Sequence, residues 1–173
     1  MEYLILDGYN IINAWKDLFD LDIESLEDCR DRLANMMSNY QGLKKISVVI
    51  VFDAHFVKGS LEKEYTFDNI KIVYTKENEA ADNYIEKFVY QLGNIHTIRV
   101  VTSDYLEQTM IMSSGGIRMS PRELRAELDT AARSMKPVLF PNKVKTNAIE
   151  SHVKPEILSK LEELRRGKFL KNQ

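Results

Sequence analysis

Short apolar runs alternate along this chain with segments in which apolar residues recur every three or four positions. Each run is short enough for a buried strand, and several end in an acidic residue. The predicted strands cover residues 3–6, 45–53, 70–74 and 96–102. Between the second and third strands, residues 54–69 alternate only weakly, which favours a loop or an irregular hairpin. Two prolines bracket residues 138–140, which suggests an edge strand.

Helical periodicity follows the strands. The predicted helices cover residues 11–19, 25–42, 78–92, 104–114, 120–135 and 155–166. Ser25 and Asn78 are the expected N-caps of their helices, and Gly42 and Gly93 are expected to end them. The inward face of segment 104–114 is expected to carry its apolar side chains Leu106, Met110 and Ile111. Segment 120–135 opens with serine, proline and glutamate in the order of a capping box.

Strands alternating with helices predict an α/β fold with a central, mainly parallel sheet flanked by helices. A chain of 173 residues that is 44% hydrophobic and 29% charged fits one domain with a sizeable core. We therefore expect residues 1–173 to form a single domain, with a basic C-terminal extension from about residue 141. The single cysteine, Cys29, lies at helical spacing among apolar residues and reads as a buried free thiol.

Charge is unevenly distributed. Residues 1–132 carry 14 Lys and Arg against 22 Asp and Glu, whereas residues 133–173 carry 10 against 4. The basic end is either a solvated helix face or a contact for nucleic acid. No apolar run is long enough to span a bilayer and the start lacks a leader pattern, so we expect a cytoplasmic protein without membrane contact.

Three of the predicted strands end at an aspartate, namely Asp7, Asp53 and Asp104. If these strands are parallel neighbours, their carboxylates meet at one edge of the sheet, and Asp82 joins them from the start of a helix. Clustered carboxylates repel one another unless a cation neutralises them, and oxygen-only ligands favour Mg²⁺ or Mn²⁺. Such a centre can hydrolyse phosphodiesters. Asn10 could orient a phosphate or a water, and Ser103 could position Asp104.

Each acid also has a purely structural interpretation. Asp7 could shape a turn, Asp82 could complement a helix dipole and Asp104 could cap a helix. Any one of them alone favours that structural interpretation. Their joint placement favours a metal site.

The motifs Asp7-Gly8-Tyr9-Asn10, Val51-Phe52-Asp53-Ala54, Ala81-Asp82-Asn83-Tyr84-Ile85-Glu86 and Thr102-Ser103-Asp104 followed by Gln108 resemble the NYN branch of PIN-like nucleases, in particular its YacP-type bacterial members. The resemblance extends from residue 3 to about residue 140. It implies a PIN-like three-layer fold and a Mg²⁺- or Mn²⁺-dependent endoribonuclease. By motif, Asp7, Asp53, Asp82 and Asp104 would form the acidic site, supported by Asn10 and Ser103. It also implies a ribosome-associated nuclease that cuts messenger RNA in the decoding site.

An acidic centre repels RNA, so basic side chains are needed nearby. The candidates by charge are Lys143, Lys145, Arg165 and Arg166, with Lys168 beside them and Lys58, Lys63 and Arg118 on expected loops. Trp15 or Tyr9 could stack on a base, although a tryptophan among apolar residues is more often a core anchor. The histidines are scattered without ligand spacing.

Three other functions compete with the nuclease. An aspartyl-phosphate hydrolase would need a second acid two residues after Asp7, where this chain has Tyr9. A phosphoacceptor signalling domain would want paired acids after the first strand, and Asp7 has no acidic neighbour on its C-terminal side. A noncatalytic RNA- or ribosome-binding module would keep the fold without turnover. The presence of all four aspartates argues against this last alternative.

Overall fold

The computed structural model describes residues 1–53, 62–77 and 79–139. The chain separates into two compact units, Met1–Ala132 and Arg133–Gln173, and the sheet lies in the first. The elements in chain order are β1 (Glu2–Asp7), α1 (Gly8–Ala14), α2 (Leu26–Lys44), β2 (Ser47–Phe52), β3 (Lys63–Phe67), β4 (Ile70–Tyr74), α3 (Ala81–Leu92), β5 (Thr97–Val101), α4 (Tyr105–Ser113), β6 (Ile117–Met119) and α5 (Pro121–Leu139).

The sheet contains six strands in the order β3-β4-β2-β1-β5-β6. β1 pairs in parallel with β2 on one side and with β5 on the other. The pairs β2–β4 and β5–β6 are also parallel, whereas β3 runs antiparallel to β4. The direction of chain progression therefore reverses at β1, and in open α/β sheets this is the place where the carboxyl ends of the strands open a crevice.

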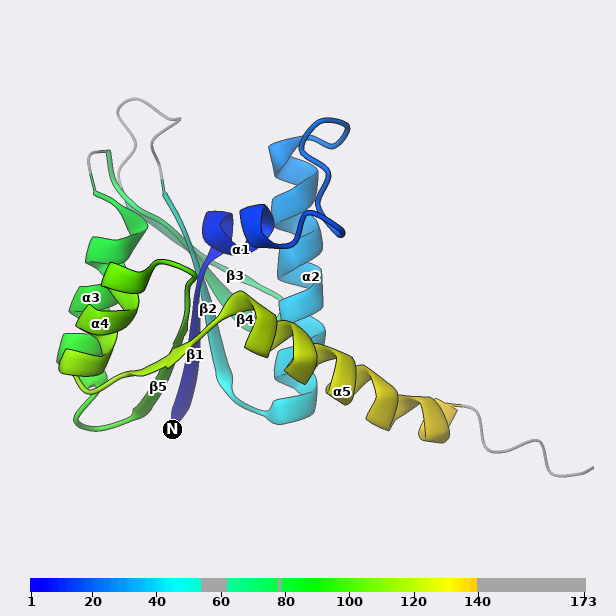
Figure 1. Cartoon of the computed structure of the whole chain (residues 1–173). Coiled ribbons are helices and arrows are strands. Elements are labelled where there is room, and N and C mark those ends of the chain that lie inside the picture. The colour runs from blue at the N-terminus through cyan, green and yellow to red at the C-terminus, as the bar shows by residue number, and fades with distance from the viewer. Residues whose placement is uncertain (54–61, 78, 140–173) are drawn as a thin grey trace, which may run out of the picture. The chain divides into compact units, whose positions relative to one another are not determined.

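Helices cover both faces of the sheet, which gives the predicted three layers. On one face, Leu4 and Leu6 of β1 pack with buried side chains of α1 and α2 and with Leu124 of α5. On the other face, Ile5 packs with Ile85 of α3 and with α4. Because successive residues of β1 point to opposite faces, its uninterrupted apolar run is what a strand buried on both sides requires. Figure 1 shows α3 and α4 together on one side of the sheet.

The first two helices differ from the prediction at their ends. α1 stops at Ala14 rather than residue 19, and Trp15 is its C-cap. Ser25 caps α2 as predicted, by accepting a hydrogen bond from the backbone N–H of Asp28 at 3.1 Å. The prediction that Gly42 ends α2 was wrong. The helix continues to Lys44, and Lys45 takes the left-handed conformation at φ 55°.

The later elements also contain corrections. Ala80 rather than Asn78 is the N-cap of α3, although Gly93 closes that helix as predicted. Ser120 and Glu123 form the predicted capping box of α5 through two reciprocal hydrogen bonds. The suggested edge strand over residues 138–140 was wrong, because α5 runs to Leu139. Strands β3 and β6 were not predicted as separate strands, and both are short and exposed over most of their length. The predicted helix 155–166 and the basic extension lie outside the described residues.

Gly8, the first residue of α1, lies directly against Phe52 of β2. A Cβ added at Gly8 would lie 2.2 Å from Cε1 of Phe52, far inside any van der Waals contact. The ring of Phe52 is fully buried and also lies against the ring of Tyr9, with 5.1 Å between the centroids. The absence of a side chain at position 8 therefore allows the chain to turn into α1 immediately after Asp7. This turn keeps the Asp7 carboxylate at the end of β1.

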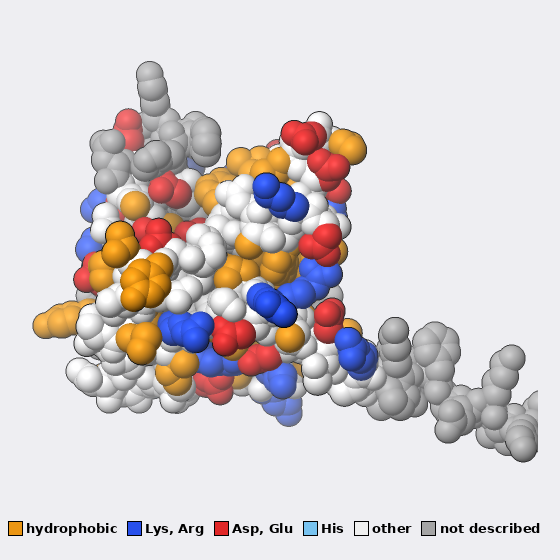
Figure 2. All heavy atoms as spheres, viewed as in Figure 1, with side chains coloured by type: hydrophobic (Ala, Val, Ile, Leu, Met, Phe, Trp, Pro, Cys, Tyr) orange, Lys and Arg blue, Asp and Glu red, His pale blue; other side chains and the backbone are white. Residues whose placement is uncertain are grey.

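Side chains of both signs are interspersed on the described part of the face shown in Figure 2. Cys29 is a buried free thiol in α2, as predicted. None of the helices in residues 1–53, 62–77 and 79–139 has the length and apolar character needed to cross a bilayer.

Candidate active site

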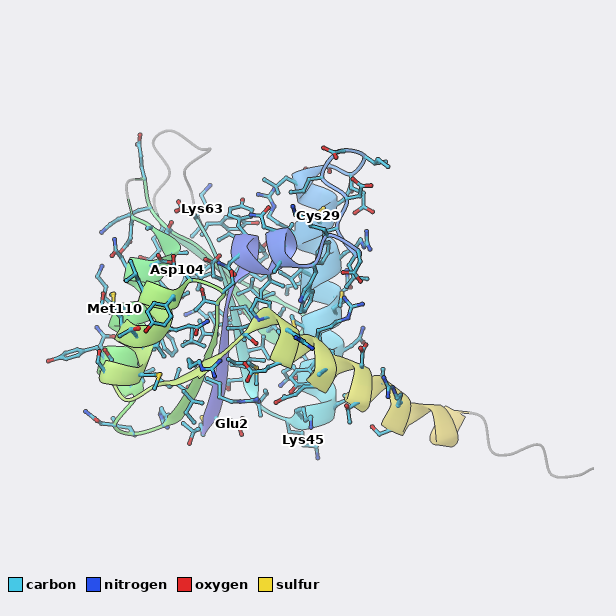
Figure 3. All side chains as sticks on the ribbon, viewed as in Figure 1. Glu2, Cys29, Lys45, Lys63, Asp104 and Met110 are labelled. Atoms are coloured by element: carbon cyan, nitrogen blue, oxygen red, sulfur yellow. The ribbon has the colours of Figure 1, made fainter. Side chains whose placement is uncertain are left out.

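The carboxyl edge of the sheet gathers the predicted aspartates. Asp7 is the last residue of β1 and pairs in register with Val51, so Asp53 leaves β2 two residues later at the same edge. Asp104 follows β5 by three residues and is the N-cap of α4. Figure 3 places Asp104 at this edge and Glu2 and Lys45 at the opposite edge. Parallel pairing of the three strands is what brings these side chains together.

Two helices complete the cluster from one face of the sheet. α3 delivers Asp82 in its first turn, and α4 delivers Glu107 in its first turn. One carboxylate oxygen each from Asp7, Asp82 and Glu107 lies within 4.8 Å of the oxygens of the other two. Oxygens bound on opposite sides of one Mg²⁺ are about 4 Å apart, since each bond is about 2.0–2.1 Å long. The distances between the three carboxylate oxygens are thus close to those expected for oxygens that bind one cation.

The carboxylates perturb one another. Burial, together with the nearby Asp82 and Asp53, raises the pKa of Asp7 to about 6, although backbone N–H groups oppose this shift. Burial and the charges of Asp104 and Asp53 raise the pKa of Asp82. Glu107 is the most affected: burial raises its pKa to about 8, the Thr102 side chain opposes this shift, and the charges of Asp82, Asp7 and Asp104 add to it. The five acids therefore share one electrostatic environment, in which a cation would relieve their repulsion.

Asn10 and Ser103 connect two walls of this site. Asn10 lies in the first turn of α1, and its backbone N–H donates to Oδ1 of Asp7 at 3.1 Å. Its own Oδ1 accepts from the backbone N–H of Ser103 at 2.9 Å and from the hydroxyl at 2.8 Å. The two residues thus tie the loop after β5 to the end of β1, which holds Asp7 and Asp104 in a fixed relation.

Thr102 and Gln108 hold the other end of that loop. Gln108 donates through Nε2 to the carbonyl of Thr102 at 2.9 Å, and the Thr102 hydroxyl accepts from the backbone N–H of Asp104 at 3.0 Å. Asp104 in turn accepts with Oδ1 from the backbone N–H groups of Leu106 at 2.7 Å and Glu107 at 3.2 Å. This local network explains why the motif begins with threonine and continues to a glutamine, because it sets the direction in which α4 starts.

Glu107 is the member of the cluster that the sequence prediction missed. The inward face of α4 is formed by Glu107 and Ile111, whereas Leu106 is 72% exposed and Met110 is 38% exposed. The prediction that Leu106 and Met110 point inward was therefore wrong. One signal was available, since Glu107 lies three residues after the N-cap and so on the same side of the helix as Asp104.

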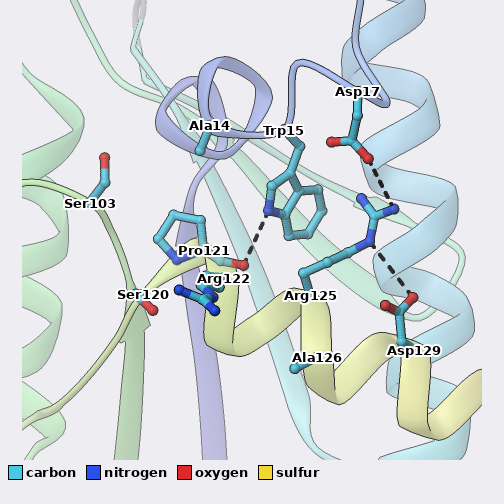
Figure 4. A pocket seen from close by; sticks show the side chains of 10 residues that line it. All are labelled: Ala14, Trp15, Asp17, Ser103, Ser120, Pro121, Arg122, Arg125, Ala126 and Asp129. Atoms are coloured by element: carbon cyan, nitrogen blue, oxygen red, sulfur yellow. Dashed lines mark hydrogen bonds and ion pairs between the residues drawn. The ribbon is translucent and has the colours of Figure 1, made fainter.

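A groove of about 710 Å³ is lined in part by Ser103 (Figure 4), which directly precedes Asp104 of the acidic cluster in the sequence. Its wall includes Pro121, Arg122 and Arg125 from the first turns of α5. Trp15 donates through Nε1 to the carbonyl of Pro121 at 3.1 Å, and the guanidinium of Arg125 lies 5.5 Å from the centre of the Trp15 ring. Arg125 also pairs with Asp17 at 3.4 Å and with Asp129 at 3.7 Å. Trp15 is only 4% exposed, which supports its interpretation as a core anchor.

Most of the basic residues predicted to contact RNA lie outside the part of the chain that the structure describes. Lys143, Lys145, Arg165, Arg166 and Lys168 lie outside the described residues, as does Lys58. Lys63 and Arg118 belong to β3 and β6 rather than to loops, and Arg118 pairs with Glu123 at 3.3 Å. Tyr9 packs on Phe52 and its hydroxyl accepts from Arg30 at 3.2 Å.

Comparison with known proteins identifies relatives over almost the whole chain. The family model of the YacP-like NYN domain matches residues 4–166. A Bacillus subtilis (strain 168) protein described as the uncharacterized protein YacP is 43% identical over 168 residues, which is 96% of this chain and 98% of that protein.

Solved structures from the same bacterium agree with this match. The crystal structure of Rae1 (YacP) from Bacillus subtilis superposes with a TM-score of 0.69 at 42% identity, with 97% of each chain covered. A tryptophan-to-leucine mutant of Rae1 superposes with a TM-score of 0.71 at 39% identity, again with 97% of each chain covered. These similarities confirm the predicted fold class and the resemblance read from the motifs.

Proposed function

Since this chain belongs to the family of YacP-like NYN domains, we propose that it is a divalent-metal-dependent endoribonuclease that hydrolyses phosphodiester bonds of single-stranded RNA. Membership in this family implies an RNA-related nuclease and a partner made of RNA. The observation that carries the metal-dependent proposal is the approach of three carboxylates from β1, α3 and α4 to within 4.8 Å of one another. Such a cluster is stable in its charged form when a cation neutralises it.

Mg²⁺ or Mn²⁺ is the cofactor that fits this site, because every candidate ligand atom is a carboxylate oxygen. We assign Asp7, Asp53, Asp82 and Asp104 to its acidic shell, as the motifs imply. When bound there, the cation supplies the Lewis-acid stabilisation that phosphodiester hydrolysis needs. Asn10 and Ser103 support the shell by fixing the end of β1 against the loop after β5.

The groove lined in part by Ser103 is our proposed path for the RNA strand. Arg122 is exposed on its wall and can meet a phosphate, whereas Arg125 is held over Trp15 by its two aspartate partners. Because Ser103 also hydrogen-bonds Asn10, a strand in this groove would pass next to the acidic cluster. Nucleotides flanking the cleaved bond would then be held by a neighbouring surface rather than by the acids, which repel phosphate.

We further propose that the substrate is messenger RNA in the decoding (A) site of the ribosome. This finer proposal rests on the resemblance of the motifs to YacP-type nucleases. The competing function is a noncatalytic module that binds RNA or ribosomes with the same fold. The mutually repelling carboxylates, among them the buried Glu107, argue for catalysis, because a module that only binds RNA has no use for this repulsion.

The test is cleavage of a labelled messenger RNA in Mn²⁺ or Mg²⁺, with and without translating ribosomes. The wild type is compared with a folded Asp7→Asn/Asp82→Asn variant. Cleavage that requires the metal and disappears in the variant supports the nuclease, and dependence on ribosomes supports the decoding-site substrate. Binding of RNA or ribosomes in EDTA, with no cleavage under any metal condition, would favour the binding module.

A further inference from the structure

The Glu107 side chain is buried without the hydrogen bonds that a buried carboxyl group normally makes. It is 4% exposed, and neither of its carboxylate oxygens makes a hydrogen bond of ordinary geometry to a described residue, although the nearby Thr102 hydroxyl offsets part of the rise in its pKa. Burying a carboxyl group without a hydrogen-bond partner is strongly unfavourable. Native folds keep such groups when a ligand satisfies them.

The backbone of α4 leaves Glu107 little freedom to point elsewhere. Asp104 fixes the first turn by accepting the backbone N–H groups of residues 106 and 107 with Oδ1. One turn later, Ile111 is buried in the core between α4, α3 and the sheet. Residues 107 and 111 share one face of the helix, so the packing of Ile111 turns Glu107 toward Asp7 and Asp82.

We infer that Glu107 is a direct ligand of the divalent cation, completing a three-carboxylate set with Asp7 and Asp82, while Asp104 acts mainly by orienting α4. This inference rests on the proposed metal-dependent function and narrows its acidic shell, because it makes Asp7, Asp82 and Glu107 the direct ligands and leaves Asp53 and Asp104 around them. Each of the three ligands comes from a different element, β1, α3 or α4, and their oxygens lie within 4.8 Å of one another. Oδ1 of Asp104 is already occupied by two backbone donors.

Direct measurement of Mn²⁺ binding to the full chain, without RNA, tests this assignment. The electron paramagnetic resonance signal of free Mn²⁺ gives the affinity of the wild type, Glu107→Gln, Asp104→Asn and Glu86→Gln. Glu86→Gln is the matched control, because it removes the same charge from α3 one turn beyond Asp82. We expect Glu107→Gln to weaken binding by at least about tenfold and Asp104→Asn to weaken it less, since asparagine still caps the helix. Glu86→Gln should change it little.

Circular dichroism and thermal melting establish that each variant is folded. Glu107→Gln keeps the shape of the side chain and replaces a buried ionisable group with a neutral amide, so we expect the fold to survive. Should it not survive, Glu107→Asp retracts the carboxylate by one methylene group and must also weaken Mn²⁺ binding.

The possible failures are distinct. If the wild type binds Mn²⁺ and cuts RNA, but Glu107→Gln or Glu107→Asp binds Mn²⁺ as tightly as the wild type, Glu107 is not a ligand and the proposed nuclease stands. If the wild type shows no Mn²⁺ binding at millimolar concentrations, the metal-dependent function falls and this assignment falls with it.

Discussion

The side-chain carbonyl of Asn10 accepts two hydrogen bonds from Ser103, one from the backbone N–H at 2.9 Å and one from the hydroxyl at 2.8 Å. The two residues are 93 positions apart in sequence and belong to different walls of the acidic site. A paired interaction of this kind fixes the loop after β5 relative to α1, and with it the separation of Asp7 from Asp104.

Replacement of Asn10 by alanine should therefore lower cleavage without unfolding the protein. Both donors of Ser103 lose their acceptor in Asn10→Ala, whereas Ser103→Ala loses only the hydroxyl bond. We expect kcat for metal-dependent RNA cleavage to fall by about 10–100-fold in Asn10→Ala, as for other residues that orient metal ligands, and by less in Ser103→Ala. Steady-state kinetics of the two variants measure this difference. A larger loss in Ser103→Ala than in Asn10→Ala would contradict the supporting role of Asn10.

The acidic cluster also predicts how stability depends on pH when metal is removed. An unfolded glutamate titrates near 4.5, whereas Glu107 in the fold has a pKa of about 8. Between these values the native state keeps a proton that the unfolded state releases, so the free energy of unfolding falls as pH rises. Asp7 adds to the fall between 3.8 and about 6. Carboxyl groups with lowered pKa values, such as that of Glu127, make the free energy of unfolding rise with pH, and they do so below pH 4.5.

Thermal melts in EDTA between pH 5 and pH 8 measure this effect. We expect the Tm of the wild type to decrease across this window. In Glu107→Gln the decrease should be shallower above pH 6, because the remaining shift of Asp7 is complete near that value. Added Mn²⁺ should restore stability most strongly at the alkaline end, since metal binding needs ionised carboxylates. A flat wild-type profile would show that the carboxylates are not perturbed in the fold.

The strand-end aspartates were predictable because their positions follow from topology alone. A buried parallel strand is an apolar run, its end is marked by the first polar residue, and neighbouring parallel strands end at the same edge. Asp7 and Asp53 satisfy this rule in the structure, Asp104 follows the end of β5 by three residues, and Asp82 joins them from the first turn of α3. The reversal of strand order at β1 is the physical reason that these ends form one site.

Glu107 was not predictable in the same way, because the pattern of hydrophobic residues predicts the wrong face of α4 to be buried. Periodicity assigns apolar side chains to the core, and it placed Leu106 and Met110 there. In the structure, the N-cap Asp104 and the buried Ile111 determine which face of α4 is turned inward. As a result the Glu107 side chain is buried and Leu106 faces solvent. A site that keeps a buried carboxyl group is where a rule based on burial of apolar residues is expected to fail. The groove beside Ser103 was missed for a different reason, since it joins segments that only tertiary packing brings together.

The contact between Gly8 and Phe52 predicts a sharp intolerance to any side chain at position 8. The Cβ in Gly8→Ala would lie 2.2 Å from the buried ring of Phe52. We expect a loss of about 1–3 kcal/mol in the free energy of unfolding, which is typical of overpacking in a core. Urea denaturation measures it. In a Phe52→Leu background the same substitution should be less damaging, because the smaller side chain leaves room for the methyl group. Equal losses in both backgrounds would mean that the strain lies elsewhere.

Arg122 provides a test of the groove as the path of RNA. It is exposed on the wall beside Ser103, so its guanidinium can meet a phosphate without touching the acidic cluster. We expect Arg122→Ala to raise KM for RNA and leave kcat nearly unchanged. The slope of log(kcat/KM) against log salt concentration should become shallower by about 0.7, the value for one phosphate contact on a single strand. Lys45→Ala removes a positive charge at the opposite edge of the sheet and serves as the control (Figure 3). If both variants show the same small change in KM and in salt dependence, RNA takes another route to the site, and the basic residues beyond Leu139 become the next to replace.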